Sequence, residues 1–262
     1  MNYLCLYHAD CADGFGAALA VHLYCTEHGY TCDFIPVQYG QDPPDVTGQY
    51  VFVVDFSYPR AVLLEMHQRA ADLVVVDHHK TAQADLADLD FCLFDMDISG
   101  AVLTWKYLLP TDLPLLFRYL QDRDLWQWKL TESREVSAAL RSYPMDFQVW
   151  TNFLSQDAIN TLREEGRAIL RYQQRAIETA VKKAHEMEFD GFHVLCLNAT
   201  NYISEIGNAL CQGRPFSITY FDTADKRVYS LRSDEQGVDV STIAKQHGGG
   251  GHPHAAGFTT KL

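Results

Sequence analysis

Short apolar runs alternate with segments of helical composition over the first part of the chain, and this alternation constrains the fold more than any other feature. The runs are rich in β-branched and aromatic residues, and they lie at 3–7, 34–37, 50–54 and 73–76. Segments such as 60–70, which have helical composition, separate them. Strands that alternate with helices pair as a parallel sheet. We therefore expect an α/β fold with a parallel sheet, whose ligands bind beyond the carboxyl ends of the strands.

The pattern changes twice further along the chain. Residues 99–150 are helical and aromatic in character, and 157–186 run without proline, with apolar residues at roughly helical spacing. Three more strand-like runs follow at 189–197, 216–221 and 227–231, with a helical segment at 202–210. These changes predict an N-terminal domain over 1–156, a long linker helix over 157–187 and a smaller α/β domain over 188–262.

Composition narrows the class of partner. The 262 residues contain 21 Lys and Arg against 34 Asp and Glu, which gives a formal charge of −13. The average field of such a chain repels a long polyanion, so we expect no long duplex nucleic acid as a partner. A small phosphorylated compound remains compatible, because bound cations invert the local potential where carboxylates converge.

Two further observations concern the compartment. No apolar run approaches the roughly 18 to 20 residues that span a bilayer, so we expect no membrane insertion. The seven cysteines are scattered without a Cys-x-x-Cys pair, which argues against a disulfide framework or a structural zinc site. The opening residues lack the basic start of a signal peptide, and a cytoplasmic protein is expected.

Three of the apolar runs are followed at once by acidic or imidazole side chains. His8 and Asp13 follow the first run, Asp55 follows the run at 50–54, and an Asp-His-His triplet at 77–79 follows the last. A single Asp after a strand is usually a helix cap or a turn residue. Burial of many carboxylates at one sheet edge, however, is unfavourable without cations. Oxygen and imidazole ligands suit divalent manganese, iron, cobalt or zinc, and the recurrence indicates a two-metal hydrolase.

Four motifs in this order resemble the signature of the DHH phosphoesterase superfamily, which includes nanoRNase-like and RecJ-related proteins. The motifs span almost the whole chain, and they are His8-x-x-Cys11-x-Asp13-Gly14, Asp55-Phe56-Ser57, Asp77-His78-His79 and the Gly-Gly-Gly-His-Pro-His-Ala-Ala-Gly stretch at 249–257. The last motif is that of the DHH-associated C-terminal domain. The resemblance implies two domains with the active site in the cleft between them.

The resemblance also implies a set of metal ligands around two ions: His8, Asp13, Asp55, His78 and Asp122. In this arrangement Asp55 bridges the ions, His8 serves the first, and the other three serve the second. Asp122 is preferred to Asp124 because the family pattern has an aromatic residue four positions after the ligand, here Trp126. Both carboxylates remain open as ligands.

One motif departs from the family pattern, in which two Asp residues flank one other residue. This chain has Cys11-Ala12-Asp13 instead, with Asp10 one position out of register. The first ion therefore has three alternative ligands: a Cys11 thiolate, the Asp10 carboxylate or a water molecule. As a metal ligand, Asp13 ranks above both Cys11 and Asp10.

The remaining members of the motifs are expected to act on the substrate or on the ligands. Asp77 is expected to orient a ligand imidazole. His79 either contacts the phosphate and helps protonate the leaving oxygen, or forms a hydrogen bond behind the ligands. Glycine N–H groups and charge-assisted bonds suit a phosphate, so the expected substrate-binding residues are Arg232, Gly249, Gly250, Gly251 and His252.

The family resemblance and the acidic composition together predict a reaction. We expect a phosphodiesterase with two Mn²⁺ ions, or Mg²⁺, Co²⁺ or Fe²⁺, that hydrolyses very short RNA to mononucleotides, especially 5′-phosphorylated dinucleotides such as pGpG. Alternatives are a cyclic-dinucleotide phosphodiesterase, a phosphatase of 3′,5′-bisphosphate nucleotides and a short-polyphosphate hydrolase. The irregular first motif also leaves open a non-catalytic module that binds phosphorylated metabolites. The oligomeric state stays open.

Overall fold

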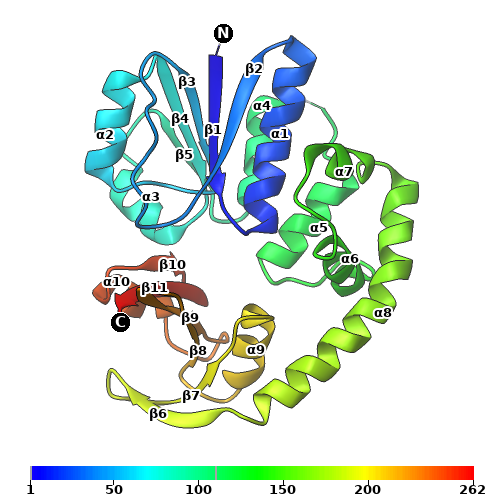
Figure 1. Cartoon of the computed structure of the whole chain (residues 1–262), viewed down its shortest axis with the longest axis vertical. Coiled ribbons are helices and arrows are strands. Elements are labelled where there is room, and N and C mark those ends of the chain that lie inside the picture. Colours follow the sequence, from blue (N-terminus) through cyan, green and yellow to red (C-terminus); the bar gives the residue numbers. More distant parts are fainter. Residues whose placement is uncertain (1, 110) are drawn as a thin grey trace. The chain divides into compact units, whose positions relative to one another are not determined.

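A computed structural model describes residues 2–109 and 111–262 of the chain (Figure 1). The chain divides into two compact units, Met1–Leu170 and Arg171–Leu262. Helix α8, Gln156–Val181, contributes residues to both units. The division therefore falls inside this helix, whereas the sequence predicts domain boundaries near its two ends.

Unit 1 is built on a five-stranded parallel sheet with the strand order β2-β1-β3-β4-β5. The strands are β1 Asn2–His8, β2 Thr31–Val37, β3 Tyr50–Val54, β4 Asp72–Asp77 and β5 Cys92–Phe94. The prediction of a parallel α/β sheet is confirmed. Strand β5 is missing from the sequence-based expectation because three residues are too short for a clear apolar run.

Helices cover both faces of this sheet (Figure 1). Helices α1 Ala12–His28 and α4 Gly100–Leu108 lie on one face, and α2 Arg60–Arg69 and α3 Lys80–Leu86 lie on the other. Helix α5 Leu115–Asp124 packs against α1 and α4, α6 Ser133–Leu140 against α5, and α7 Phe147–Asn152 against α1. Alternate strand residues point to opposite faces. Cys5 and Val54 pack with α1 and α4 in one core, whereas Leu6 and Val53 pack with α2 and α3 in the other. Burial of both faces explains why these strands are continuously apolar.

The register of the sheet aligns the carboxyl ends of its three central strands. Tyr7 pairs with Val54, and Val54 pairs with Val76. The residues that follow these pairs, His8, Asp55 and Asp77, are thereby brought to one edge.

Unit 2 contains a six-stranded mixed sheet with the order β10-β11-β9-β8-β7-β6. Strands β7 and β8 are parallel and the other neighbours are antiparallel. The strands are β6 His185–Phe189, β7 Phe192–Asn198, β8 Ser217–Asp222, β9 Lys226–Arg232, β10 Gly250–His252 and β11 Ala255–Lys261, and the helices are α9 Ile203–Leu210 and α10 Val240–Gln246.

The helix predicted over 157–187 is too long at its C-terminal end. Helix α8 ends at Val181, and His185–Phe189 pairs with β7 as strand β6. Asp190 and Gly191, both with positive φ, form the two-residue turn of this hairpin. Pairing with β7 therefore overrides the helical spacing of residues 185–187. The single strand predicted over 189–197 is divided by the turn between β6 and β7.

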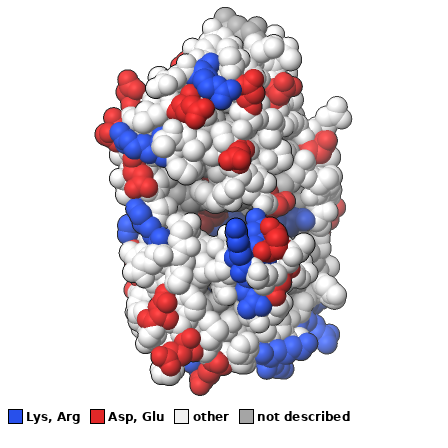
Figure 2. All heavy atoms as spheres, turned by 60° about the vertical axis from the view of Figure 1, so that its left-hand side comes forward, with Lys and Arg blue, Asp and Glu red and all other residues white. Residues whose placement is uncertain are grey.

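The formal charge is divided unequally between the units. Residues 171–262 contain ten Lys and Arg and ten Asp and Glu, so the whole net charge of −13 resides in unit 1. Acidic and basic side chains are interspersed over the face drawn in Figure 2. Among the described residues, the helices include none that is both long and apolar enough to cross a bilayer.

Candidate metal centre in unit 1

Acidic and imidazole side chains from distant points of the sequence meet at the carboxyl edge of the unit 1 sheet. His8, Asp55 and His79 form one group and Asp13, Asp55 and His78 form another, and in each group the potential ligand atoms lie within 4.8 Å of one another. Asp55 belongs to both groups. Its carboxylate can therefore join two adjacent cation sites, as the resemblance implies.

His78 is the centre of the more buried group. Its Nε2 lies 3.1 Å from Oδ1 of Asp55, 3.5 Å from Oδ2 of Asp124 and 3.7 Å from Oδ2 of Asp13. On the other side of Asp55, Oδ2 lies 3.4 Å from Nδ1 of His8. Three carboxylates thus converge on one imidazole in a place where Asp13 and Asp55 are 2% and 1% exposed.

Several atoms of this cluster are buried without a hydrogen-bond partner in the described part of the chain. They are Nδ1 of His8, Oδ1 of Asp13, both carboxylate oxygens of Asp55 and Oδ2 of Asp124. Buried polar atoms are almost always satisfied, because an unsatisfied one costs on the order of 1–3 kcal/mol. A set of oxygen and nitrogen atoms that share this defect fits a divalent cation, which would satisfy all of them together.

The pKa values reflect the same crowding. Burial, together with the carboxylates of Asp124 and Asp55, raises the pKa of Asp13 well above its usual range. Burial also disfavours charge on Asp55, but His78 and His8 outweigh it and hold the pKa of that carboxyl well below the usual value. Against the same burial, Asp55 and Asp124 raise the pKa of His78 to about 11. The shifts share one cause: positive charge is strongly favoured among these buried carboxylates.

The backbone around Asp55 is fixed by close packing. Asp55 has a φ of 52°, in the left-handed region, and its N–H donates to the carbonyl of Val76 at 2.9 Å. The N-terminus of α4 packs directly on its side chain, since a Cβ on Gly100 would lie 2.6 Å from Oδ1. Sequence reasoning missed Gly100, although a Ser-Gly pair at the start of a helix is a recognisable signal.

The start of α4 also holds Asp13. The N–H of Ala101 donates to Oδ2 of Asp13 at 3.2 Å. A helix N-terminus carries partial positive charge and favours a carboxylate. Helix α4 therefore positions two carboxylates of the cluster from one end.

Asp77 lies behind the cluster and is completely buried. Its carboxylate accepts hydrogen bonds from Ser57 Oγ at 2.6 Å and from the N–H of His78 at 2.8 Å, and it lies 2.7 Å from Nδ1 of His79. Although burial opposes the charge, His79 and Ser57 lower the pKa of Asp77 to about 2. An ionised Asp77 holds the His79 ring, and Ser57, to which sequence reasoning gave no role, orients Asp77 in turn.

The structure does not bring Asp122 to the cluster. Its carboxylate accepts the N–H groups of Lys129 at 2.8 Å and Leu130 at 3.2 Å, so it ties down the loop after α5. Asp124, at the C-terminal end of α5, faces His78 instead. The choice of Asp122 over Asp124 is therefore corrected, because the side chains two positions apart on a helix point in different directions.

The irregular first motif is resolved in part. Asp10 accepts a hydrogen bond from the side-chain amide of Gln38 at 3.0 Å and is exposed. Cys11 is the N-cap residue of α1, and burial and the charge of Asp55 raise the pKa of its thiol, although His8 opposes them. Neither residue belongs to the two ligand groups, whereas Asp13 does.

In unit 2, the structure aligns two of the expected phosphate-binding residues. Ala255 pairs with Arg232 on one side and with His252 on the other, so these three residues form one row across adjacent strands. The Arg232 guanidinium donates to Ser204 Oγ and to the carbonyl of Leu231, both at 2.9 Å. The expected glycines lie at the same edge of the sheet, with Gly249 just before β10 and Gly250 and Gly251 within it.

Comparisons with known proteins agree with this geometry. Residues 203–262 match the DHHA1 domain family. Over 97% of its length the chain is 31% identical to the uncharacterized protein R106 of Acanthamoeba polyphaga mimivirus, and over 70% it is 28% identical to the oligoribonuclease NrnB of Bacillus subtilis. The chain belongs to the DHH phosphoesterase superfamily. It spans 66% and 51% of the length of these two relatives.

Solved structures show that the fold is shared. This DHH protein aligns over its whole length with the pGpG-specific phosphodiesterase PggH of Vibrio cholerae, covering 94% of that chain with a TM-score of 0.51 and 13% identity. It aligns over 98% of its length with RecJ of Thermus thermophilus in complex with Mn²⁺, covering 49% of that chain with a TM-score of 0.54 and 15% identity. The family and the fold predicted from sequence are confirmed.

Proposed function

We propose that this DHH protein is a metal-dependent phosphodiesterase that hydrolyses very short, 5′-phosphorylated oligoribonucleotides to mononucleotides. The observation that carries this proposal is the buried cluster around Asp55, whose carboxylate oxygens have no hydrogen-bond partner among the described residues. A purely structural cluster of this kind would be strongly destabilising. A cluster that binds cations explains both the burial and the missing hydrogen bonds.

Each residue of the cluster has a proposed role. Asp55 binds both ions, His8 binds the first, and the second is held by Asp13, His78 and Asp124. When bound, divalent cations supply Lewis-acid stabilisation of the phosphoryl oxygens and activation of water. Two Mn²⁺ ions are the proposed cofactors, and Mg²⁺, Co²⁺ and Fe²⁺ are the competitors to be compared with them.

His79 is proposed to hold the proton that the leaving oxygen needs. Asp77, which its low pKa keeps ionised at neutral pH, lies 2.7 Å from Nδ1 of the ring. With Nδ1 committed to Asp77, only Nε2 can exchange a proton with a substrate. His79 also lies close to His8 and Asp55, so a ligand role at the first ion is the alternative.

The proposed substrate class rests on three supports. The relative NrnB is named as an oligoribonuclease. The row of Arg232, Ala255 and His252 in unit 2 offers charge-assisted and backbone hydrogen bonds to a terminal phosphate. The net charge of −13 in unit 1 disfavours long polyanions.

The seven cysteines are all free thiols, which supports a reducing compartment such as the cytoplasm.

A substrate ladder tests the proposal. Purified protein with Mn²⁺ is given 5′-phosphorylated RNA of two to twenty nucleotides, and we expect the dinucleotide to be cleaved fastest, with mononucleotides as products. Asp55→Asn should abolish turnover, whereas the exposed Asp33→Asn should not. Equal turnover of two and twenty nucleotides would overturn the length preference. Linear dinucleotides from a cyclic substrate, release of orthophosphate, or no turnover at all would point to the alternatives.

A further inference from the structure

The second half of helix α8, together with the two residues that follow it, is basic in an acidic protein. Residues 171–183 contain four Lys and Arg and a single Glu, whereas the chain as a whole has a formal charge of −13. Among the described residues, none of these four cations has an ion-pair partner: Arg171, Arg175, Lys182 and Lys183. Other cations of the chain are paired, such as Arg214 with Glu186 and Arg227 with Asp222. The charge on α8 is therefore available to a ligand.

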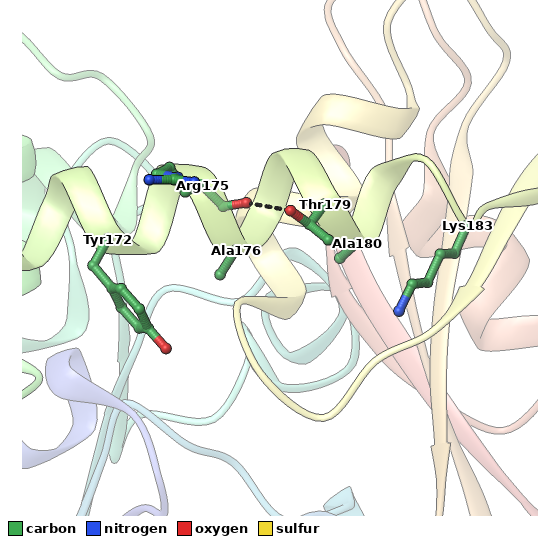
Figure 3. A pocket seen from close by; sticks show the side chains of 6 residues that line it. All are labelled: Tyr172, Arg175, Ala176, Thr179, Ala180 and Lys183. Atoms are coloured by element: carbon green, nitrogen blue, oxygen red, sulfur yellow. Dashed lines mark hydrogen bonds between the residues drawn. The ribbon is translucent and has the colours of Figure 1, made fainter.

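An exposed aromatic ring and a hollow accompany this charge. An open hollow of about 480 Å³ lies along the helix and is lined by Tyr172, Arg175, Ala176, Thr179, Ala180 and Lys183 (Figure 3). Tyr172, Ala176 and Lys183 point to the same side of the helix, as residues spaced by three or four positions do. Tyr172 is 73% exposed. Ala176 and Ala180 lie between Tyr172 and Lys183 in the lining, and their small side chains leave room for a planar base.

We propose that this α8 face, defined by the six lining residues, binds a single-stranded oligonucleotide. The cations of Arg175 and Lys183 would contact phosphates, and the Tyr172 ring would stack on a base. Aromatic rings beside cations are the recurring means of binding single strands without sequence preference. From Tyr172 to the end of α8 at Val181 the helix runs about 14 Å, and Lys183 lies two residues further along the chain. This length is more than the ~3.4 Å rise of one stacked nucleotide. The face therefore suits a strand of several nucleotides.

Two other occupants fit less well. A second copy of the chain in a two-fold contact would bring two basic faces into one interface, where their like charges repel. An acidic peptide would use the cations but leaves the exposed ring without a role. The proposal rests on the proposed function only in that its ligand belongs to the same chemical class as the substrate.

Binding is measured by fluorescence anisotropy with a labelled twelve-nucleotide single-stranded RNA and the full-length protein in EDTA, where no turnover is expected. Tyr172→Ala should weaken binding by about fivefold or more, from the loss of one stacked base. Tyr107→Ala, which removes an exposed tyrosine of unit 1, is the matched control. Lys183→Glu should weaken binding and lower the log–log salt slope by about 0.7. Lys261→Glu makes the same charge change at another exposed position of unit 2 and should leave that slope unchanged.

Turnover of a 5′-phosphorylated dinucleotide separates this proposal from the proposed function. We expect Tyr172→Ala and Lys183→Glu to retain it. If wild-type protein cleaves no dinucleotide but both variants lose RNA binding, the proposed function fails and the α8 face stands. If the variants bind the RNA as tightly as wild type does, or if Tyr172→Ala instead lowers the sedimentation mass, the α8 face is not a nucleic-acid site.

Discussion

Gly100 and Asp55 are in such close contact that a single added methyl group would separate them. A Cβ on Gly100 would lie 2.6 Å from Oδ1 of Asp55 and 2.7 Å from its Cβ. The carboxylate that joins the two ligand groups is therefore held by backbone packing on one side and by His8 and His78 on the other.

Gly100→Ala is expected to weaken metal binding by about 10- to 100-fold, because Asp55 must move away from its ligand position. Isothermal titration calorimetry with Mn²⁺ measures this change in affinity. Gly237→Ala is the matched control, since its new Cβ would lie 2.5 Å from the carbonyl oxygen of Pro215 in unit 2, a clash of similar size outside the ligand cluster. Equal metal affinity for the two variants would show that the contact at Gly100 does not position Asp55.

Asp124→Asn and Asp122→Asn should have different effects. Asp124→Asn removes a proposed ligand and is expected to lower kcat/KM by about 100-fold or more. It should also raise the stability of the metal-free protein, because it removes one carboxylate from a crowded buried cluster. Asp122→Asn should retain metal but lose about 1 kcal/mol of stability, since it weakens the acceptor for the N–H groups of Lys129 and Leu130. If Asp122→Asn loses its metal and Asp124→Asn keeps it, the assignment is reversed.

Metal affinity should rise with pH. The pKa of His78 in the metal-free protein is raised to about 11, so its imidazole is protonated at neutral pH and must lose a proton to bind a cation. Affinity should therefore increase about tenfold per pH unit for each proton released. Mn²⁺ titrations at pH 6.5, 7.5 and 8.5 measure the slope, and an affinity that does not change with pH contradicts the expected protonation of His78.

The metal-free protein should show the opposite trend in stability. A folded-state pKa above the ordinary imidazole value of 6.5 stabilises the fold below pH 6.5, and this contribution is lost as pH rises toward 11. Denaturant unfolding in EDTA at pH 6.5 and 9 measures it, with His78→Gln as the comparison. A wild-type chain that loses no more stability than His78→Gln over this range would exclude the contribution.

Gly207→Ala is expected to disturb the proposed phosphate site of unit 2. A Cβ at this position would lie 2.7 Å from Cγ of Arg232 and would displace the guanidinium from Ser204. KM for a 5′-phosphorylated dinucleotide should rise about tenfold or more, while kcat changes little. Ser204→Ala, which removes one hydrogen bond without a clash, should raise KM less. An unchanged KM in Gly207→Ala would remove Arg232 from the binding site.

The ligand-bearing edge of the unit 1 sheet can be predicted from the sequence, because it depends on a local pattern that recurs: an apolar strand followed at once by acidic or imidazole residues. Tyr7, Val54 and Val76 pair side by side in the parallel sheet, so the residues that follow them in the sequence must lie together at one edge. The choice between Asp122 and Asp124 was not accessible in the same way. Both residues lie in the last turn of α5, and only the packing of that helix against α1 and α4 decides which carboxylate faces His78.

Unit 2 shows where sequence patterns mislead. The Asp190-Gly191 turn is a strong hairpin signal, but it lies inside the apolar run at 189–197, whose pattern predicts one continuous strand. Strand β10 consists of Gly250, Gly251 and His252, whose composition gives no strand propensity. It forms because β11 supplies a neighbour, which is a tertiary effect.

Anomalous scattering from a crystal soaked in Mn²⁺ tests the metal centre most directly. We expect two peaks that share Asp55, one beside His8 and the other between Asp13, His78 and Asp124. A crystal in which these side chains point away from one another with no ion among them would contradict the metal centre and the hydrolytic function that depends on it.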